Sequence, residues 1–457
     1  MNRVEKNIQE YKYYSISVVG LGRSGMAAAH LAKFLGAKVL VNDFANSQSI
    51  KSNLQKLNSF GINGIIGGFT DQIYNSDVIV ISPGVPADSV FIKEALQKGM
   101  KVISEIEFAS LFTNLPIVGV TGTNGKSTTV HALTEMCQSK EINGVLAGNI
   151  GTAFSEKILE ELQNPDPKRV YILEISSFQL EFIDSFHPYI SVFLNITQDH
   201  LDRHKNFKNY LKAKLRLAEN QTDQDYIIYN SDDQILVKSL RSKKIQQITF
   251  SLSDSDNPVY CVKKSQIINR ECAKLVDLEE IGQPGQHNLY NLLAAASAAH
   301  CLGISDIQIS NIKKTFKGIP HRLEKVAEIN GVEYINDSKA TNIDAVKVAL
   351  DSFPNPIVLI LGGKAKGNEF AKLKDYSDKV KRIIAYGAAK ELIYSELQST
   401  FKISRVGPLK DAINLAHDEA ILNDIVLLSP GCASFDQFKN FEERGEKFAQ
   451  WVGELVQ

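Results

Sequence analysis

Residues 121–129 form a glycine-rich turn that carries a lysine and several hydroxyl groups, in the order Thr-Gly-Thr-Asn-Gly-Lys-Ser-Thr-Thr. An apolar run at 116–120 precedes the turn, and apolar residues at helical spacing follow it. Backbone amides in a turn between a strand and a helix stabilise phosphate oxygens, and the helix dipole adds to this effect. Lys126 can reach the outer phosphates, and Ser127 can ligate Mg²⁺. The turn therefore predicts a nucleoside triphosphate site. Its predicted lining residues are Gly122, Thr123, Asn124, Gly125, Lys126, Ser127 and Thr128.

The spacing of this turn departs from the usual phosphate loop at one position. Val120 stands five residues before Gly125, where a glycine is usual, and glycines fall at 119 and 122 instead. A glycine-rich turn with a surface lysine is the alternative interpretation. Lys126 and the later Arg322 are both expected to lie in loops that are exposed without a ligand.

A second glycine-rich segment, Gly-Leu-Gly-Arg-Ser-Gly at 20–25, follows the first apolar run and opens a helical pattern. Asp43 ends the next apolar run, about twenty residues on, which completes a dinucleotide fingerprint. The pattern requires only a diphosphate and a ribose-like hydroxyl, so a UDP-linked sugar satisfies it as well as NAD does. Residues 82–84, Ser-Pro-Gly, follow a later strand and would line the same crevice, or they form a simple turn.

Two further side chains, Glu174 and His200, are candidates for a site beside residues 121–129. Glu174 ends the apolar run 170–173, which places a metal ligand or a water-orienting carboxylate at the same sheet edge, although a plain exposed carboxylate is the alternative. His200 follows the next strand and is a candidate for metal or substrate contact, where a lone histidine is more often structural. Lys214 is expected to be a solvated lysine on a helix, because nothing in its sequence surroundings marks it.

Cationic and hydroxyl side chains gather in four loops of the last third of the chain. These loops are 320–322, 336–342, the loop with Lys366, and 429–434. Clusters of this kind bind anionic groups, so the loops predict a site shared between domains.

The elements that must position these residues form three α/β units. The expected parallel strands are 16–19, 39–41, 78–81 and 102–103, then 116–120, 170–173, 190–194, 226–229 and 247–250, then 357–361, 383–386 and 425–428. An alanine- and leucine-rich helix is expected at 288–301. The predicted domains are 1–104, a Rossmann-like domain; 105–318, a central P-loop domain; and 319–457, a second Rossmann-like domain.

The composition of the chain limits the partners and the compartment that we expect. The chain has 457 residues, with 51 basic against 52 acidic side chains, so nothing indicates a nucleic acid or an acidic membrane as partner. The five cysteines are scattered without metal-binding spacing, which suits a reducing compartment. The first fourteen residues lack a signal peptide, and no apolar run approaches a membrane span. We expect a cytoplasmic monomer that acts on small molecules.

Several blocks together resemble the Mur ligase family of cell-wall synthesis over essentially the whole chain. The matching blocks are 122–127, 148–151, 174–180, 285–288, 318–322, 336–342 and 432–441. The run Cys-Ala-Ser-Phe-Asp-Gln-Phe-Lys-Asn-Phe at 432–441 is the most specific of them and is similar to the D-glutamate-adding members. The resemblance implies ATP-driven amide bond formation between UDP-N-acetylmuramoyl-L-alanine and D-glutamate through an acyl phosphate.

The resemblance also assigns residues to roles. Two Mg²⁺ sites are implied, with Ser127 and Glu174 at one, and His200 with a carbamylated Lys214 at the other. The residues implied to contact ATP outside residues 121–129 are Asn288, Asn291, Arg322, Asp337 and Lys339. Those implied to position D-glutamate are Thr341, Lys366, Ser434 and Phe441. Those implied for the nucleotide sugar are Leu21, Gly22, Arg23, Asp43, Phe44, Ser82, Gly84 and Asn149, together with His200.

Three alternatives stay open on sequence grounds. Another amide ligase of the family or a folate polyglutamylating enzyme would share the central domain, but the glycine-rich first domain and residues 435–441 argue against both. A nicotinamide-dependent dehydrogenase would use residues 20–25 and leave Lys126 without a role. A non-catalytic nucleotide sensor would not need Arg322, Lys339 and Lys366 together.

Overall fold

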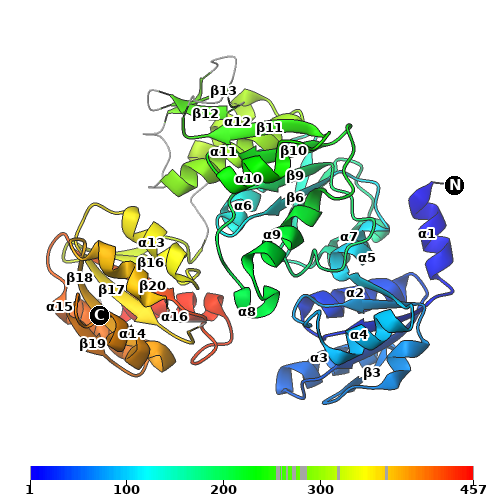
Figure 1. Cartoon of the computed structure of the whole chain (residues 1–457), viewed down its shortest axis with the longest axis horizontal. Coiled ribbons are helices and arrows are strands. Elements are labelled where there is room, and N and C mark those ends of the chain that lie inside the picture. Colours follow the sequence, from blue (N-terminus) through cyan, green and yellow to red (C-terminus); the bar gives the residue numbers. More distant parts are fainter. Residues whose placement is uncertain are drawn as a thin grey trace. The chain divides into compact units, whose positions relative to one another are not determined.

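The computed structural model describes residues 2–253, 258, 260–263, 266–269, 274–277, 286–315, 320–365 and 369–455. These residues form three β-sheets flanked by helices (Figure 1). The chain divides into two compact units, Met1–Ile281 with Leu289–Phe316, and Gly282–Asn288 with Lys317–Gln457. The first two sheets belong to the first unit, and the third sheet belongs to the second unit.

The first sheet is entirely parallel, in the order β3-β2-β1-β4-β5. Its elements, after the N-terminal helix α1 (Arg3–Tyr11), are β1 (Ser15–Val19), α2 (Arg23–Phe34), β2 (Lys38–Asp43), α3 (Gln48–Ser59), β3 (Asn63–Ile66), η1 (Asp71–Asn75), β4 (Val78–Ile81), α4 (Val90–Gln97) and β5 (Lys101–Ser104). Successive residues of β1 point to opposite faces of the sheet. Val18 packs with α2 and α3, whereas Val19 packs with α4. The strand order reverses at β1 and β4, so their carboxyl ends open a crevice suited to a ligand.

The second sheet has nine strands, in the order β14-β13-β12-β11-β10-β9-β6-β8-β7. Its strands are β6 (Ile117–Thr121), β7 (Asn143–Gly148), β8 (Arg169–Glu174), β9 (Ile190–Phe193), β10 (Tyr226–Asn230), β11 (Gln246–Ser251), β12 (Tyr260–Lys263), β13 (Gln266–Asn269) and β14 (Lys274–Asp277). Its helices are α5 (Glu105–Ser110), α6 (Lys126–Met136), α7 (Phe154–Gln163), α8 (Leu201–His204), α9 (Phe207–Leu215), η2 (Arg216–Ala218), α10 (Gln234–Leu240), α11 (Gln286–Cys301) and α12 (Asp306–Thr315). The strands predicted for this unit, β6, β8, β9, β10 and β11, pair in parallel, whereas the unpredicted β13 pairs antiparallel with β12 and β14.

A buried carboxylate joins the first two sheets within this unit. Glu107 is fully buried and accepts hydrogen bonds from the amides of Asp184, Ser185 and Phe186, at 2.7 to 3.1 Å. The neighbouring Ser104 at the end of β5 donates its amide to Phe182 O at 2.8 Å. The start of the second sheet's domain is therefore anchored directly beside the last strand of the first sheet.

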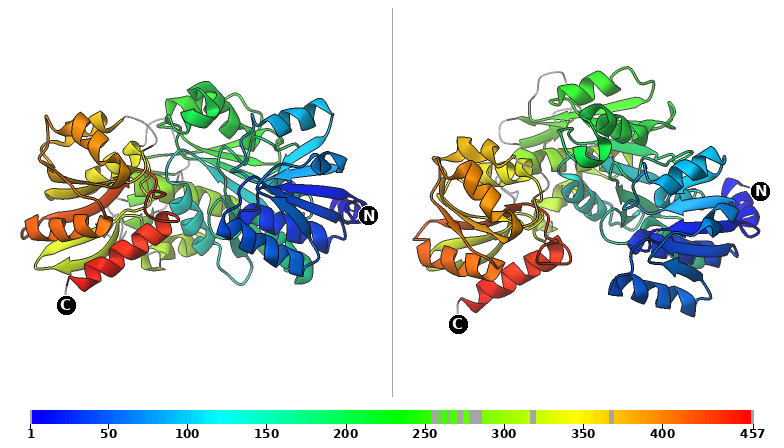
Figure 2. Two further views of the ribbon diagram at one scale, coloured as in Figure 1. Left: turned by 90° about the horizontal axis from the view of Figure 1, so that it is seen from below. Right: turned by 60° about the horizontal axis from the view of Figure 1, so that its bottom comes forward.

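The third sheet has the order β15-β16-β20-β17-β18-β19, and only β15 runs antiparallel to its neighbour. Its elements are β15 (Glu324–Ile329), β16 (Val332–Asn336), α13 (Ile343–Asp351), β17 (Ile357–Gly362), η4 (Phe370–Tyr376), β18 (Val380–Tyr386), η5 (Gly387–Ala389), α14 (Lys390–Leu397), β19 (Ile403–Arg405), α15 (Leu409–Glu419), β20 (Ile425–Gly431) and α16 (Phe441–Glu454). One hydrophobic cluster packs α13 and α14 on one face, and a second packs α15 and α16, the latter red in Figure 2, on the other.

Each sheet falls within one predicted domain range, and the boundaries themselves stay predictions.

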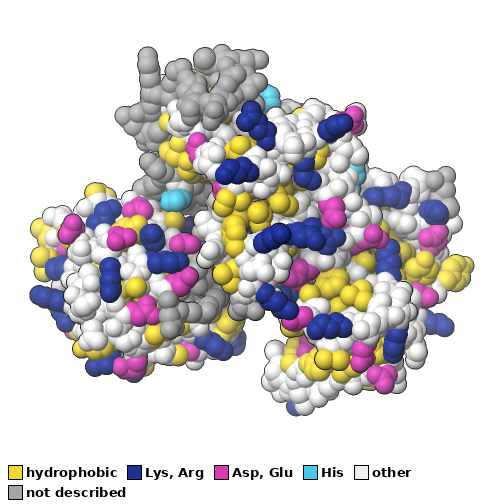
Figure 3. Space-filling view, in the orientation of Figure 1, with side chains coloured by type: hydrophobic (Ala, Val, Ile, Leu, Met, Phe, Trp, Pro, Cys, Tyr) yellow, Lys and Arg dark blue, Asp and Glu magenta, His cyan; other side chains and the backbone are white. Residues whose placement is uncertain are grey.

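Within the described ranges, no helix combines the length and apolar character that crossing a bilayer requires. Basic and acidic side chains are interspersed over the described residues of the face in Figure 3. Cys137, Cys261 and Cys432 are buried.

Candidate active site

The glycine-rich turn lies between β6 and α6, as predicted, and we call residues 121–129 the phosphate loop. Gly122 and Gly125 have φ values of 155° and 87°, which L side chains rarely adopt. A Cβ at Gly125 would also lie 2.1 Å from Oδ1 of Asn291 on α11. Asn195 fixes the middle of the turn, because its side chain accepts from the Asn124 amide at 2.9 Å and donates to Asn124 O at 3.0 Å.

Lys126 is the first residue of α6 and is partly buried, so the expectation of an exposed loop lysine is wrong. Its Nζ donates to Gly122 O at 2.9 Å and to Thr123 O at 2.8 Å. The side chain therefore folds back over the phosphate loop. The ammonium group lies where the outer phosphates of a nucleotide would bind.

Lys214 is not the solvated lysine that the sequence suggested, because only 2% of the residue is exposed. It lies on α9, one turn after Tyr210, and both side chains face the phosphate loop. The Lys214 Nζ donates to Gly122 O at 2.8 Å. Burial lowers the pKa of Lys214 well below its ordinary value, and the nearby charge of Lys126 lowers it further. The two lysines thus share one loop carbonyl.

Glu174 ends β8 beside the phosphate loop, as predicted, but it is buried rather than exposed. Its Oε2 accepts a short hydrogen bond from Ser127 Oγ, and its Oε1 accepts from Asn149 Nδ2 at 2.8 Å. Asn149 O in turn accepts from Arg23 Nη2 at 2.8 Å. A continuous polar chain therefore runs from the phosphate loop to the start of α2.

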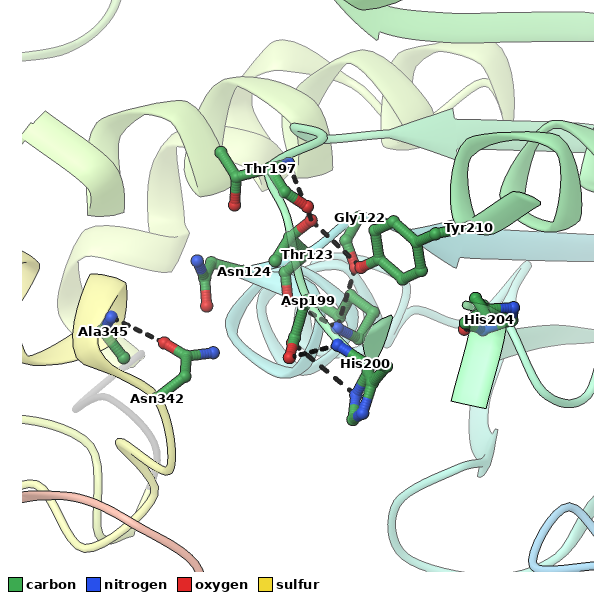
Figure 4. A network of polar contacts seen from close by, with 12 residues as sticks. Gly122, Thr123, Asn124, Thr197, Asp199, His200, His204, Tyr210, Asn342 and Ala345 are labelled. Carbon is green, nitrogen blue, oxygen red and sulfur yellow. Dashed lines mark hydrogen bonds and ion pairs between the residues drawn. The ribbon is translucent and has the colours of Figure 1, made fainter. Parts of the chain in front are cut away.

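His200 precedes α8 in a left-handed conformation, with φ of 53°, and its neighbour Asp199 lies 3.6 Å from the ring Nε2. Figure 4 shows both residues beside Gly122 and Thr123. Among the described residues, no group of three or more His, Cys, Asp or Glu side chains is arranged to hold a metal ion. The predicted metal residues include only one carboxylate and one imidazole. A carbamate on the buried Lys214 would add a second anion, and anionic oxygen ligands are the kind that Mg²⁺ prefers.

A pocket of about 620 Å³ opens at the carboxyl ends of β1 and β4, and we call it the β1–β4 pocket. Seven of the eight residues predicted mainly for the nucleotide sugar line it, namely Gly22, Arg23, Asp43, Phe44, Ser82, Gly84 and Asn149. The eighth, Leu21, does not line it: its side chain is buried, and its amide donates to Asp43 Oδ2 at 2.6 Å. The exposed Phe44 ring stacks on Phe69 at 5.6 Å.

The third sheet brings most of the predicted C-terminal residues to one edge. Arg322 Nε lies 4.0 Å from Oδ1 of Asp337, and Ser429 Oγ donates to Oδ2 at 2.8 Å. Burial raises the pKa of Asp337 to about 6, although Arg322 opposes the rise. Arg322 is partly buried, which corrects the expectation of an exposed loop.

Side-chain contacts hold the loops after β16 and β20 next to each other at this edge of the third sheet. The Lys339 Nζ lies 5.2 Å from the centre of the Phe441 ring, and Ser434 is buried. The fully buried Arg444 donates to Ser338 O at 2.6 Å and to Cys432 O at 3.1 Å. The two predicted substrate loops are therefore held by one guanidinium.

Of the remaining predicted residues, Thr341 and Asn288 lie in the described part of the chain. Thr341 is partly buried in the loop after β16. Asn288 lies one turn before Asn291 on α11. Lys366 lies outside the described residues.

Sequence reasoning missed three residues that shape the phosphate-loop site: Asn195, Asp199 and Tyr210. The Tyr210 hydroxyl lies 3.1 Å from Thr123 Oγ1, and the Lys214 Nζ lies 4.9 Å from the centre of the Tyr210 ring. Asn195 and Asp199 lie two and six residues after the end of β9 at Phe193, so their place after a strand beside the phosphate loop was the available signal. Tyr210 carries no such signal, because only the packing of α9 brings it to the loop.

Comparison with known proteins gives matches in all three parts of the chain. Residues 14–104 match the family described as Mur ligase MurD-like, N-terminal domain. Residues 120–299 match the Mur ligase middle domain. Residues 321–432 match the Mur ligase, glutamate ligase domain.

Full-length relatives agree with these matches. A UDP-N-acetylmuramoylalanine--D-glutamate ligase of Thermoanaerobacter sp. (strain X514) is 42% identical over 460 residues, covering 98% of this chain and 99% of that protein. The crystal structure of UDP-N-acetylmuramate-alanine ligase MurC from Thermotoga maritima shares the fold, with a TM-score of 0.62 at 17% identity, covering 97% of this chain and 100% of that one. A MurF ligase from Thermotoga maritima in complex with ADP also shares it, with a TM-score of 0.58 at 17% identity, covering 83% and 95%.

Proposed function

Because this chain belongs to the Mur ligase family, we propose that the site around its phosphate loop drives the ATP-dependent addition of D-glutamate to UDP-N-acetylmuramoyl-L-alanine. One observation carries the proposal. A phosphate loop with two lysines at Gly122 O and a separate β1–β4 pocket lie in one unit, joined by the polar chain through Asn149 and Glu174. A ligase that activates a nucleotide-linked carboxylate needs both sites.

The residues near the phosphate loop would act on the reacting carboxylate and the γ-phosphate of ATP. The alanyl carboxylate attacks the γ-phosphorus, the bond to ADP breaks, and the amine of D-glutamate then displaces phosphate from the acyl phosphate. Lys126 would neutralise the charge that develops on the transferring phosphoryl group. Bound Mg²⁺ would add Lewis-acid stabilisation of the phosphate oxygens. Ser127 and Glu174 would hold one such ion, and His200 and a carbamylated Lys214 would hold a second.

The third sheet would supply the D-glutamate site and further contacts to ATP. Arg322, Asp337 and Lys339 share one edge of that sheet, and above pH 6 the Asp337 carboxylate is mostly ionised and can accept hydrogen bonds. Asn288 and Asn291, one turn apart on α11, would contact the nucleotide. The predicted D-glutamate residues are Thr341, Lys366, Ser434 and Phe441. We also expect the enzyme to act in the cytoplasm, as a monomer, on small molecules alone.

The amino-acid specificity can be tested by phosphate release. We expect ATP and UDP-N-acetylmuramoyl-L-alanine to give rapid phosphate release with D-glutamate, because two carboxylates suit the cationic and hydroxyl groups of the third sheet. L-Lysine and other diamino acids, which carry an amine in place of the second carboxylate, should give at least about a hundredfold less, since a site built for one polar group discriminates strongly against analogues that lack it. Equal use of L-lysine would contradict the proposal.

The β1–β4 pocket should bind a uridine nucleotide and not NADH. A dehydrogenase has no use for a second phosphate site, and the β1–β4 pocket already reaches it through Arg23 and Asn149. Equilibrium titration with UDP-N-acetylmuramoyl-L-alanine and with NADH would compare the two ligands directly. Tight NADH binding that the UDP-sugar fails to displace would assign this pocket to hydride chemistry instead.

A further inference from the structure

Arg203 on α8 contacts two loops from different sheets of the first unit. Its Nη1 donates to Pro83 O at 2.7 Å, and its Nη2 donates to Val85 O at 2.9 Å. The same Nη2 donates to Glu181 Oε2 at 2.8 Å, and only 17% of the Arg203 side chain is exposed. A single guanidinium therefore links the loop after β4 to the loop after β8.

The first of these loops forms part of the β1–β4 pocket. Residues 82–86 all line that pocket. Their turn is fixed on the pocket side by Ser82, whose Oγ donates to Gly20 O at 2.7 Å. Beyond Ser82, the carbonyls of Pro83 and Val85 accept the hydrogen bonds from Arg203. The shape of this side of the pocket thus depends on a residue of α8.

The other end of α8 carries His200. This helix has only four residues and lies between two left-handed residues, His200 with φ of 53° and Lys205 with φ of 69°. A helix this short does not hold its own position, so tertiary contacts must do so. His204 supplies one of these contacts, since its Nε2 lies 2.9 Å from Ser177 Oγ.

Phe178 completes the link between Arg203 and His200. The Arg203 guanidinium carbon lies 4.0 Å from the centre of the Phe178 ring, within cation–π range. The edge of the same ring meets the His200 ring at 4.9 Å, and His204 stacks on it at 5.4 Å. A displacement of Arg203 therefore reaches His200 through one shared aromatic ring.

We propose that Arg203 is a positioning residue that couples occupancy of the β1–β4 pocket to the placement of His200. The proposal rests on the proposed function, because it takes this pocket as the nucleotide-sugar site. The nucleotide sugar would contact residues 82–86, two carbonyls of this loop hold Arg203, and Arg203 contacts Phe178 beside α8. A lysine could reach one carbonyl but not both together with Glu181, so the geometry requires the fork of an arginine.

The test compares Arg203→Ala and Arg203→Lys with Lys212→Ala, a matched loss of an exposed cation on α9. Calorimetry with UDP-N-acetylmuramoyl-L-alanine should show a Kd about tenfold weaker for Arg203→Ala, as expected for losing a hydrogen bond from a charged donor. Arg203→Lys should fall between Arg203→Ala and the parent, and Lys212→Ala should match the parent. The KM for ATP should not change in any variant.

A double-mutant cycle with His200→Asn separates positioning from a structural role. If Arg203 acts on turnover through His200, Arg203→Ala lowers kcat in the parent but lowers it little further in His200→Asn. The weaker Kd persists in both backgrounds. Additive losses of kcat, an unchanged Kd, or unfolding of both Arg203 variants by circular dichroism would each overturn the proposal. Failure of the parent to bind the nucleotide sugar would instead count against the proposed function.

Discussion

Lys126→Ala is expected to lower turnover by a factor of about 10³ to 10⁵, the value of one cation positioned on a transferring phosphoryl group. The effect follows from the place of the lysine at the start of α6, where its Nζ already lies 2.8 Å from Thr123 O. The melting temperature should change little, because the variant loses two hydrogen bonds to carbonyls, each worth about 1 kcal/mol net. Steady-state phosphate release and thermal denaturation measure the two quantities.

Lys140→Ala is the matched control for this variant. Lys140 is an exposed lysine beyond the far end of α6, so its loss removes the same charge without touching the phosphate loop. Turnover and stability should both stay close to those of the parent. A Lys126→Ala protein that unfolds, or one that keeps most of its activity, would show that Lys126 supports the loop and not the reaction.

Strands that are buried on both faces of a sheet can be predicted from the local sequence. β4 and β17 consist of β-branched and other apolar residues that are buried along their length, and their positions were predicted. β3 is the edge strand of its sheet, is partly exposed and contains Gly64, so it lacks that pattern. β15 alternates partly buried and exposed residues, and its antiparallel pairing could not be read from a strand list.

Some active-site residues can likewise be predicted from the local sequence, whereas others depend on tertiary packing. The phosphate loop and Glu174 are marked by their place between a strand and a helix or at a strand end, which is local. Lys214 is marked by nothing local, because its burial depends on α9 packing its Tyr210 face onto the loop. The same holds for Arg203, whose two carbonyl acceptors, Pro83 and Val85, lie about 120 residues away along the chain. Charge type alone cannot separate such residues from solvated ones.

Lys214→Ala is expected to be nearly inactive, because it removes the anion that a carbamate would supply to the second Mg²⁺ site. A carbamate forms when a neutral amine attacks carbon dioxide and loses a proton. Burial favours the neutral amine, since it lowers the pKa of Lys214 well below its ordinary value. Activity of the parent should therefore fall when bicarbonate is exhaustively removed and return when it is restored, and acetate should partly rescue Lys214→Ala.

Lys214→Arg distinguishes a carbamate from a simple cation. A guanidinium keeps its charge and is not carbamylated, so this variant should be inactive, while Lys212→Ala on the exposed side of the same helix should keep parent activity. Nuclear magnetic resonance with ¹³C-labelled bicarbonate provides a readout apart from turnover: a carbamate carbonyl signal should appear in the parent and be absent from Lys214→Ala. If Lys214→Arg retains parent activity, Lys214 acts as a buried cation that braces Gly122 O, and the second metal site must use other ligands.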